Sequence, residues 1–196
     1  MSIPSLEKAS FLMAETDPAK VPAAAAEVAF VGRSNSGKSS LINALCRKDL
    51  ARTSSTPGRT RTINAYRVDE RSLLVDLPGY GFATGPEAER AGWGKMIEGY
   101  LLRRPSLKAA LVLLDAKIGP TKLDVQMLSW LQAEGVPWRV IAAKTDQVQP
   151  SRSLARRREV AAAAGVAPEA LAWVSAKDGA GIKDLRLELQ RLLGEA

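Results

Sequence analysis

Short apolar runs alternate along the chain with longer segments in which apolar residues recur at helical spacing. Most of the short runs are almost continuously apolar, which is typical of strands that helices cover on both faces. Because such strands alternate with helices, the pattern predicts an α/β fold of three layers, with a mostly parallel sheet of six strands and with five helices. The expected strands are 28–31, 63–68, 72–75, 109–114, 140–142 and 172–174, and the expected helices are 39–47, 87–103, 122–134, 152–164 and 182–193.

One expected strand, residues 63–68, differs from the others because polar residues interleave with its apolar ones. Only a short turn at Asp69 and Glu70 separates it from the strand at 72–75, so we expect a hairpin in which 63–68 is an antiparallel edge strand. Segments 47–61 and 78–86 lack periodicity and are rich in Gly, Pro, Ser and Thr. Long irregular segments in a compact domain are usually functional, so these two are candidate moving parts.

Composition narrows the chemistry. The chain has 196 residues, a length typical of one domain, and 28 Lys and Arg against 21 Asp and Glu give a formal charge of +7. It contains no histidine, which excludes Ser-His and Cys-His catalysis and His-ligated metals. Cys46 is the single cysteine, so no intramolecular disulfide forms; a buried core residue is the favoured interpretation and a reactive thiol the alternative.

The sequence carries no sign of a membrane segment. No uncharged apolar run approaches the ~18–20 residues that span a bilayer. Residues 1–20 lack both the basic start and the continuous apolar stretch of a secretory signal peptide. We therefore expect a soluble, cytoplasmic protein without membrane insertion, and the absence of a heptad pattern favours a monomer.

The strongest local signal is a GxxxxGK[ST] motif that directly follows an expected strand and opens an expected helix. Its glycines let backbone N–H groups turn inward around phosphates, and the helix N-terminus adds positive potential. Lys38 would reach the β- and γ-phosphates, where it would act in catalysis, and the Ser39 hydroxyl could bind Mg²⁺. The candidate phosphate-binding residues are Gly32, Arg33, Ser34, Asn35, Ser36, Gly37, Lys38 and Ser39.

A DxxG motif follows the strand at 72–75 and consists of Asp76, Leu77, Pro78 and Gly79. There the Asp76 carboxylate would lie near Mg²⁺, and the Gly79 N–H could meet a γ-phosphate during catalysis. Turn sequences often produce DxxG by chance, but its position after the phosphate-binding motif raises its weight. The sequence therefore predicts that both motifs serve one nucleotide.

Two further motifs point to guanine. Ala143, Lys144, Thr145 and Asp146 end the strand at 140–142, and a carboxylate there can accept hydrogen bonds from N1 and the N2 amino group of guanine. Adenine presents no such pair of donors, so Asp146 favours GTP over ATP. After the last strand, a backbone N–H could contact the guanine O6. The residues expected to supply that contact are Val174, Ser175 and Ala176.

The chain also carries Thr-Pro-Gly-Arg-Thr-Arg-Thr at 56–62 and Asp-Leu-Pro-Gly-Tyr-Gly at 76–81. With these segments, the motifs resemble the EngB (YihA/YsxC) family of P-loop GTPases, within the TrmE-Era-EngA-EngB-septin-like class. The resemblance implies a P-loop GTPase fold at 23–196 after an N-terminal extension at 1–22. It implies that Thr60 joins Ser39 and Asp76 at Mg²⁺ and acts in catalysis. It also implies a role in assembly of the large ribosomal subunit and in normal cell division and septation. The nucleotide would be lined by Gly58, Arg59, Thr60, Arg61 and Thr62.

Three positions qualify the resemblance. Ala143 stands where the family commonly has threonine, so a side chain that could tie this loop to the phosphate-binding loop is missing, which puts nucleotide affinity in doubt. Tyr80 stands where many GTPases hold a water-orienting glutamine, so we expect slow intrinsic hydrolysis. Asn35 matches an asparagine that holds K⁺ in related GTPases without that glutamine; the alternative is an ordinary turn residue.

The positive charge suggests an anionic partner, and we expect contact with the backbone of ribosomal RNA in a large-subunit precursor. The alternative is that the basic clusters are solvated helix faces. A nucleotide-gated RNA- or ribosome-binding module with incidental hydrolysis is the rival function, and a P-loop kinase is disfavoured by Asp76 and Asp146. The basic clusters are Arg47 with Lys48, Arg59 with Arg61, Arg103 and Arg104 with Lys108, and Arg152 with Arg156, Arg157 and Arg158.

Overall fold

The computed structural model describes residues 4–52, 62–80 and 87–194, without the side chains of 87–93. Within these residues seven strands form one sheet in the order β1-β3-β4-β2-β5-β6-β7. The strands are β1 (Ser10–Glu15), β2 (Ala26–Gly32), β3 (Ile63–Arg67), β4 (Ser72–Asp76), β5 (Leu107–Asp115), β6 (Trp138–Ala143) and β7 (Ala172–Trp173). The α-helices are α1 (Lys38–Cys46), α2 (Glu87–Arg103), α3 (Lys122–Ala133), α4 (Ser153–Ala163) and α5 (Ile182–Gly194).

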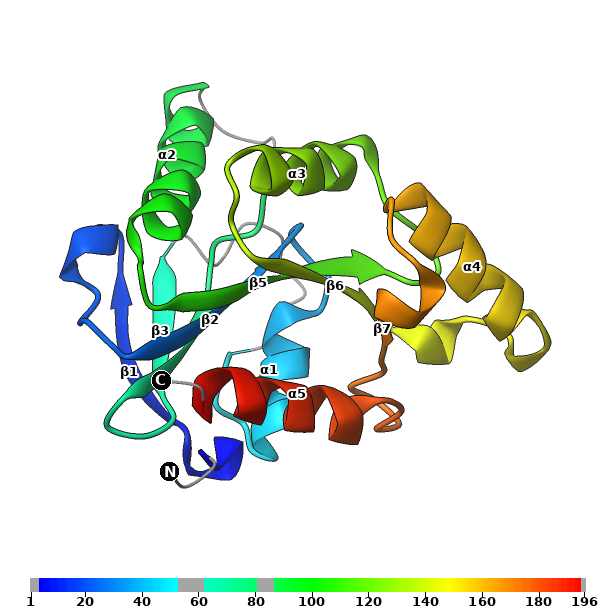
Figure 1. Cartoon of the computed structure of the whole chain (residues 1–196), viewed down its shortest axis with the longest axis horizontal. Coiled ribbons are helices and arrows are strands. Elements are labelled where there is room, and N and C mark those ends of the chain that lie inside the picture. The colour runs from blue at the N-terminus through cyan, green and yellow to red at the C-terminus, as the bar shows by residue number, and fades with distance from the viewer. Residues whose placement is uncertain (1–3, 53–61, 81–86, 195–196) are drawn as a thin grey trace.

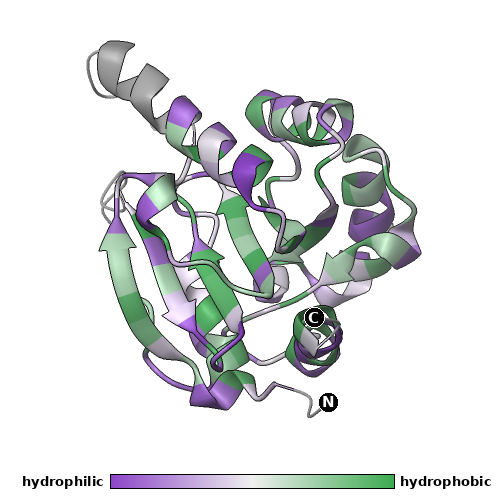
Figure 2. Ribbon diagram, turned by 60° about the vertical axis from the view of Figure 1, so that its left-hand side comes forward, coloured by the Kyte–Doolittle hydropathy of each residue, from purple (hydrophilic) through white to green (hydrophobic). Residues whose placement is uncertain are grey.

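The predicted three-layer α/β architecture is confirmed. Buried residues of α2, α3 and α4 pack with one face of the sheet, and those of α1 and α5 pack with the other (Figure 1). The central strand β2 is buried along its whole length, because neighbours flank it on both sides and helices cover both faces. In Figure 2 the central strands are mostly green, whereas the helices alternate between green and purple, as amphipathic helices do.

The sheet differs from the prediction at its antiparallel end. The antiparallel pairing of 63–68 with the next strand is confirmed, but β3 is not the edge strand, because β1 pairs with its other side. The sequence predicted six strands and did not predict β1. None of the β1 side chains is fully buried, although Leu12 and Met13 pack partly against the core, so the strand leaves only a weak hydrophobic pattern.

The parallel part of the sheet determines where loops meet. Strands β4, β2, β5, β6 and β7 run in one direction, so their carboxyl ends share one edge. Asp76 ends β4 opposite Phe30 of β2, and Asp115 ends β5 opposite Ala143 of β6. Ligands bind at this edge in open α/β sheets. The four sequence motifs therefore converge at one edge although they are far apart in the chain.

Cys46 is buried in the core on α1, and burial raises the pKa of its thiol to about 11. The interpretation as a core residue is therefore confirmed, because a reactive thiol needs a lowered pKa.

Among the described residues, no helix has both the length and the apolar character needed to cross a membrane.

Two of the expected surface arginines are occupied by backbone contacts. Arg156 donates from Nε to the carbonyl of Ala116 at 2.9 Å, and Arg157 donates to the carbonyl of Leu171 at 2.9 Å. Both side chains therefore fasten loops to α4 and are not free members of a basic surface cluster. In this cluster Arg152 and Arg158 are the exposed arginines.

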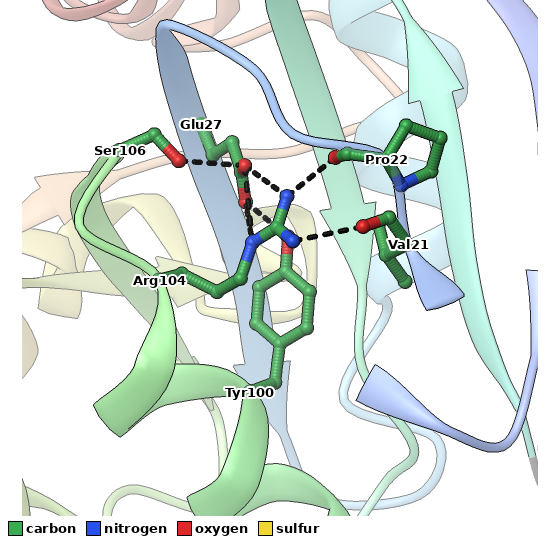
Figure 3. A network of polar contacts seen from close by, with 6 residues as sticks. All are labelled: Val21, Pro22, Glu27, Tyr100, Arg104 and Ser106. Atoms are coloured by element: carbon green, nitrogen blue, oxygen red, sulfur yellow. Dashed lines mark hydrogen bonds and ion pairs between the residues drawn. The ribbon is translucent and has the colours of Figure 1, made fainter. Parts of the chain in front are cut away.

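Glu27 on β2 is fully buried and organises a network of polar contacts (Figure 3). Its carboxylate forms an ion pair with Arg104 just beyond the end of α2 and accepts hydrogen bonds from the hydroxyls of Tyr100 and of Ser106, the latter at 2.7 Å. Arg104 also donates to the carbonyl of Val21 at 2.9 Å. The network thus joins β2, α2 and the segment before β2, and Arg104 is another arginine that the sequence analysis wrongly placed in a surface cluster.

We expect Arg104→Ala to lower the free energy of unfolding by about 3–5 kcal/mol, because the buried Glu27 carboxylate would lose its counter-charge. Urea denaturation followed by circular dichroism measures this loss. The matched control is Arg139→Ala, which breaks the exposed Arg139–Glu188 pair and should cost less than about 1 kcal/mol. Equal losses in the two variants would contradict the structural role of the Glu27 network.

Candidate functional site

The phosphate-binding loop lies between the end of β2 and the start of α1. Gly37 has φ +98° and Asn35 has φ +65°, conformations that turn the backbone sharply before the helix begins at Lys38. A Cβ on Gly32 would lie 2.7 Å from Ser36 Oγ and 3.0 Å from the Leu113 carbonyl oxygen. Gly32 is therefore required by close packing between the loop and β5.

Lys38 reaches back over this loop. Its side chain is almost fully buried, and Nζ donates to the Gly32 carbonyl at 3.3 Å. Burial lowers the pKa of Lys38, and the nearby Asp76 carboxylate partly opposes that shift. The Nζ contact places the Lys38 ammonium group at the loop, where its charge adds to the positive end of α1. Both contributions favour an anion at this position.

Asp76 and Ser39 meet beside the loop, as their motifs predict. Ser39 Oγ donates to Asp76 Oδ2 at 3.4 Å, while Asp76 Oδ1 is buried and has no hydrogen-bond partner among the described residues. Burial raises the pKa of Asp76 to about 6, with Lys38 and Ser39 acting in the opposite direction. A buried carboxylate oxygen without a protein partner, next to a hydroxyl, is the oxygen donor set that Mg²⁺ uses through its water shell.

Gly79 and Tyr80 run alongside the phosphate-binding loop. A Cβ on Gly79 would lie 2.7 Å from Ser34 N, and Tyr80 N donates to the Gly32 carbonyl at 3.3 Å. The Tyr80 hydroxyl donates to Asp124 Oδ1 at 2.7 Å, at the start of α3. Burial, together with the Asp124 charge, raises the pKa of Tyr80, so the phenol stays neutral. Its hydroxyl is directed at α3 and held there.

The loop after β6 is joined to the phosphate-binding loop by Lys144. Its Nζ donates to the Asn35 carbonyl at 2.6 Å and to Asp115 Oδ2 at 3.0 Å. Ala143 cannot make such a link, but Lys144 supplies one from the next position. The role of Asp115 was not predicted from the sequence, where the available signal was a carboxylate at the end of an apolar strand.

Asp146 is held by the loop after β7. Ser175 is fully buried, and its Oγ donates to Asp146 Oδ1 at 2.9 Å while accepting from the Lys177 N–H at 3.2 Å. Thr145 N donates to the Val174 carbonyl at 3.2 Å, so the two loops are also joined by backbone. Asp146 itself remains exposed. Its carboxylate is therefore oriented by a buried hydroxyl and open to a ligand.

A pocket of about 720 Å³ lies between these loops and the end of α1. The volume is within the range of small-molecule sites. The lining brings together six of the residues predicted to bind nucleotide, namely Gly37, Ala143, Lys144, Asp146, Val174 and Ala176. Gly58, Arg59, Thr60 and Arg61 lie outside the described residues; Thr62, which is described, donates from Oγ1 to Asn64 Oδ1 at 3.2 Å. The remaining lining residues are Ser40, Leu41, Asn43, Ala44, Arg47, Lys48, Asp49, Gln147 and Lys177.

Residues 27–144 match a family model described as a 50S ribosome-binding GTPase. A "Probable GTP-binding protein EngB" of Geobacter metallireducens is 43% identical over 194 residues, which cover 97% of this chain and 95% of the relative. The chain belongs to the EngB family. The EngB relative from Pelotomaculum thermopropionicum is 44% identical over 96% of this chain and 97% of its own length. A solved structure of a probable GTP-binding protein EngB has a TM-score of 0.70 at 25% identity, and covers 87% of this chain and 100% of that one.

Membership in the EngB family makes this chain a GTP-binding protein and a GTP hydrolase with a P-loop GTPase fold. The geometry described above is consistent with that assignment at both ends of a nucleotide. The Lys38 side chain lies against the phosphate-binding loop, and Asp146 presents an exposed carboxylate in the lining of the pocket. Lys144 connects the two ends.

We expect Asp115→Asn to speed release of GDP about three- to tenfold, because Lys144 loses its charged partner and the two loops are joined less firmly. Asparagine keeps an oxygen that can accept from the Lys117 N–H, so the local turn survives. Stopped-flow release of a fluorescent GDP measures the effect. The control is Asp69→Asn, which alters a comparable exposed turn where Asp69 accepts from the Arg71 N–H, and it should release GDP at the rate of the unchanged chain. Identical release rates in the two variants would refute the proposed role of the Lys144–Asp115 contact.

Proposed function

We propose that this chain is a guanine-nucleotide switch that acts in assembly of the large ribosomal subunit. The observation that carries the proposal is the joined pair of loops in which Ser175 orients Asp146 and Lys144 reaches the Asn35 carbonyl. Such an arrangement suits one ligand with a guanine at one end and phosphates at the other. The family description, a 50S ribosome-binding GTPase, supports the ribosomal part of the proposal.

At the phosphate end, each residue has a role that its position suits. Lys38 neutralises negative charge on the β- and γ-phosphates, and the N–H groups at the start of α1 bind phosphate oxygens. The Gly79 N–H meets the γ-phosphate from the side of the DxxG motif. Ser39 and Asp76 hold Mg²⁺, with Thr60 joining them in the GTP state. When bound, Mg²⁺ neutralises charge that develops on the phosphate oxygens.

At the nucleoside end, Asp146 selects guanine and the backbone of Val174, Ser175 and Ala176 lies beside the base. A carboxylate with one oxygen fixed by Ser175 still accepts the N1–H and N2–H donors of guanine, because each oxygen has two lone pairs. The pocket of about 720 Å³ leaves room for the ribose beside the base. GTP and GDP share this half of the site.

Hydrolysis is proposed to be slow in the isolated chain. The Tyr80 hydroxyl is engaged with Asp124, so it does not orient an attacking water as a glutamine amide does. A K⁺ ion at Asn35 or a ribosomal partner would then supply the missing charge stabilisation. The strained backbone at Asn35 is compatible with a functional position and also with a turn residue.

The proposed partner is ribosomal RNA of a large-subunit precursor, contacted mainly through phosphates. The net charge of +7 supports an anionic partner, and two exposed lysines, Lys48 and Lys177, line the nucleotide pocket. Nucleotide-dependent binding at such a position couples GTP state to assembly. A cytoplasmic location, a monomeric state and a requirement in cell division and septation belong to the same proposal.

We expect Asp146→Asn to weaken GDP binding by about a hundredfold or more and to favour xanthine nucleotides, because an amide pairs with the N1–H and the C2 carbonyl of xanthine. Competition of GDP and XDP against a fluorescent nucleotide measures the change. Asp184→Asn, an exposed change on α5, serves as the control. If Asp146→Asn kept the preference for guanine, the proposed base site would be wrong.

Co-sedimentation with large-subunit precursors tests the ribosomal role. We expect binding with a GTP analogue to exceed binding with GDP and to fall steeply between low and high salt. GTP turnover is measured on the same fractions, in potassium and in sodium buffers, and should rise with particles. Lys38→Ala serves as the control for nucleotide dependence. Binding that ignores nucleotide and salt would contradict the proposal, and binding without faster turnover would favour the nucleotide-gated module.

A further inference from the structure

Asn43, on the pocket side of α1, makes an unusual set of contacts with the chain that follows the helix. Its Oδ1 accepts hydrogen bonds from Leu50 N at 2.9 Å and from Ala51 N at 2.6 Å. Its Nδ2 donates to the Ala51 carbonyl at 2.9 Å, and its own carbonyl accepts from Lys48 N at 3.2 Å. One residue therefore satisfies four backbone groups of a single loop.

The loop held in this way consists of Arg47, Lys48, Asp49, Leu50 and Ala51 and is called the α1 loop below. It begins at Arg47, whose left-handed backbone at φ +53° ends the helix. Its far end is anchored in the core, since Ala51 is buried. Arg47 also forms an ion pair with Glu7 at 2.9 Å. The α1 loop is therefore fixed at both ends, with Asn43 as its central attachment.

The α1 loop forms one wall of the 720 Å³ pocket. Arg47, Lys48 and Asp49 line the pocket on this side, and Asp146 and Ala176, from the loops after β6 and β7, line it opposite them. Asn43 lies among the lining residues, while the phosphate-binding Lys38 does not. The wall that Asn43 supports thus lies at the nucleoside end of the site.

A side-chain amide is well suited to this task. It offers both an acceptor and a donor, and so pairs with the N–H and the carbonyl of Ala51 at the same time. Alanine would leave these groups without partners, although Ala51 is buried, and such groups are costly. Aspartate would keep the acceptor and lose the donor. The two substitutions therefore remove different parts of the attachment.

We propose that Asn43 is a positioning residue for the nucleotide: it holds the α1 loop as a wall of the pocket and thereby determines how long the nucleoside half of GDP or GTP stays bound. This rests on the proposed location of guanosine between the α1 loop and Asp146. Because GDP and GTP share the nucleoside, the effect is equal for both. Asn43 touches no reacting atom, so the rate of the chemical step is unchanged.

The test compares Asn43→Ala, Asn43→Asp and the unchanged full chain. Stopped-flow release of fluorescent GDP and of a fluorescent GTP analogue gives dissociation rates. Single-turnover hydrolysis of bound GTP gives the rate of the chemical step. Hydrogen exchange at the amides of Leu50 and Ala51 reports the attachment itself. Gln190→Ala is the matched control, because it removes an amide that donates to the Pro4 carbonyl at 2.9 Å, far along the chain on α5.

For Asn43→Ala we expect release of both nucleotides to be about tenfold faster, exchange at Leu50 and Ala51 to lose its protection, and single-turnover hydrolysis to stay within about twofold. Asn43→Asp should fall between the alanine variant and the unchanged chain, with much of the protection kept, because its carboxylate still accepts both N–H groups. Gln190→Ala should match the unchanged chain in release.

Release within about twofold of the unchanged chain in both Asn43 variants would overturn the proposal. Acceleration confined to the GTP analogue would also overturn it, because the effect would then arise at the γ-phosphate. If Asn43→Ala does not fold, Asn43→Asp decides by the same criteria. The proposed base site is tested independently of the Asn43 variants. If Asp146→Asn kept its preference for guanine, the base site would be wrong, whatever the Asn43 variants do.

Discussion

The ammonium group of Lys144 holds the site together. It donates at 2.6 Å to a carbonyl of the phosphate-binding loop and at 3.0 Å to Asp115 at the end of β5. Through these contacts the loop after β6 is fixed relative to the loop after β2, although β5 lies between their strands. A ligand that spans both loops therefore meets a preformed geometry, which limits the ordering that binding requires.

Burial gives the phosphate end its electrostatic character. Lys38 and Asp76 are opposite charges in a largely dehydrated region, and burial shifts the pKa of each toward its neutral form. Their mutual attraction opposes both shifts, yet Asp76 keeps a buried oxygen without a protein partner. Such a region is poor for stability and well suited to an anion and a divalent cation, because each would supply charge that the protein alone leaves uncompensated. A buried ion pair that stabilises the fold lies elsewhere in the structure, where Arg104 neutralises the Glu27 carboxylate.

The sequence predicted those parts of the fold that depend on hydrophobic periodicity. The boundaries of α2 agree with the prediction, and the parallel strands were located from their continuous apolar runs. The edge strand β1 was missed because its side chains are only partly buried and leave a weak hydrophobic pattern. The four nucleotide motifs were readable because each needs particular residue types at fixed spacing. Asn43 and Asp115 were not assigned roles, since their partners are backbone groups or residues distant in the sequence. Arg104 and Arg156 were misplaced for the same reason: a sequence shows a charge but not what neutralises or binds it.

The central claim is that one guanine nucleotide spans the carboxyl edge of the sheet, from the phosphate-binding loop to Asp146. A crystal structure of the full chain grown with GDP and Mg²⁺ tests it most directly. The account predicts the β-phosphate against the backbone amides that begin α1, the guanine N1 and N2 within hydrogen-bond distance of the Asp146 carboxylate, and Lys144 still bonded to the Asn35 carbonyl. A guanine bound away from Asp146, or phosphates bound away from Lys38, would contradict it.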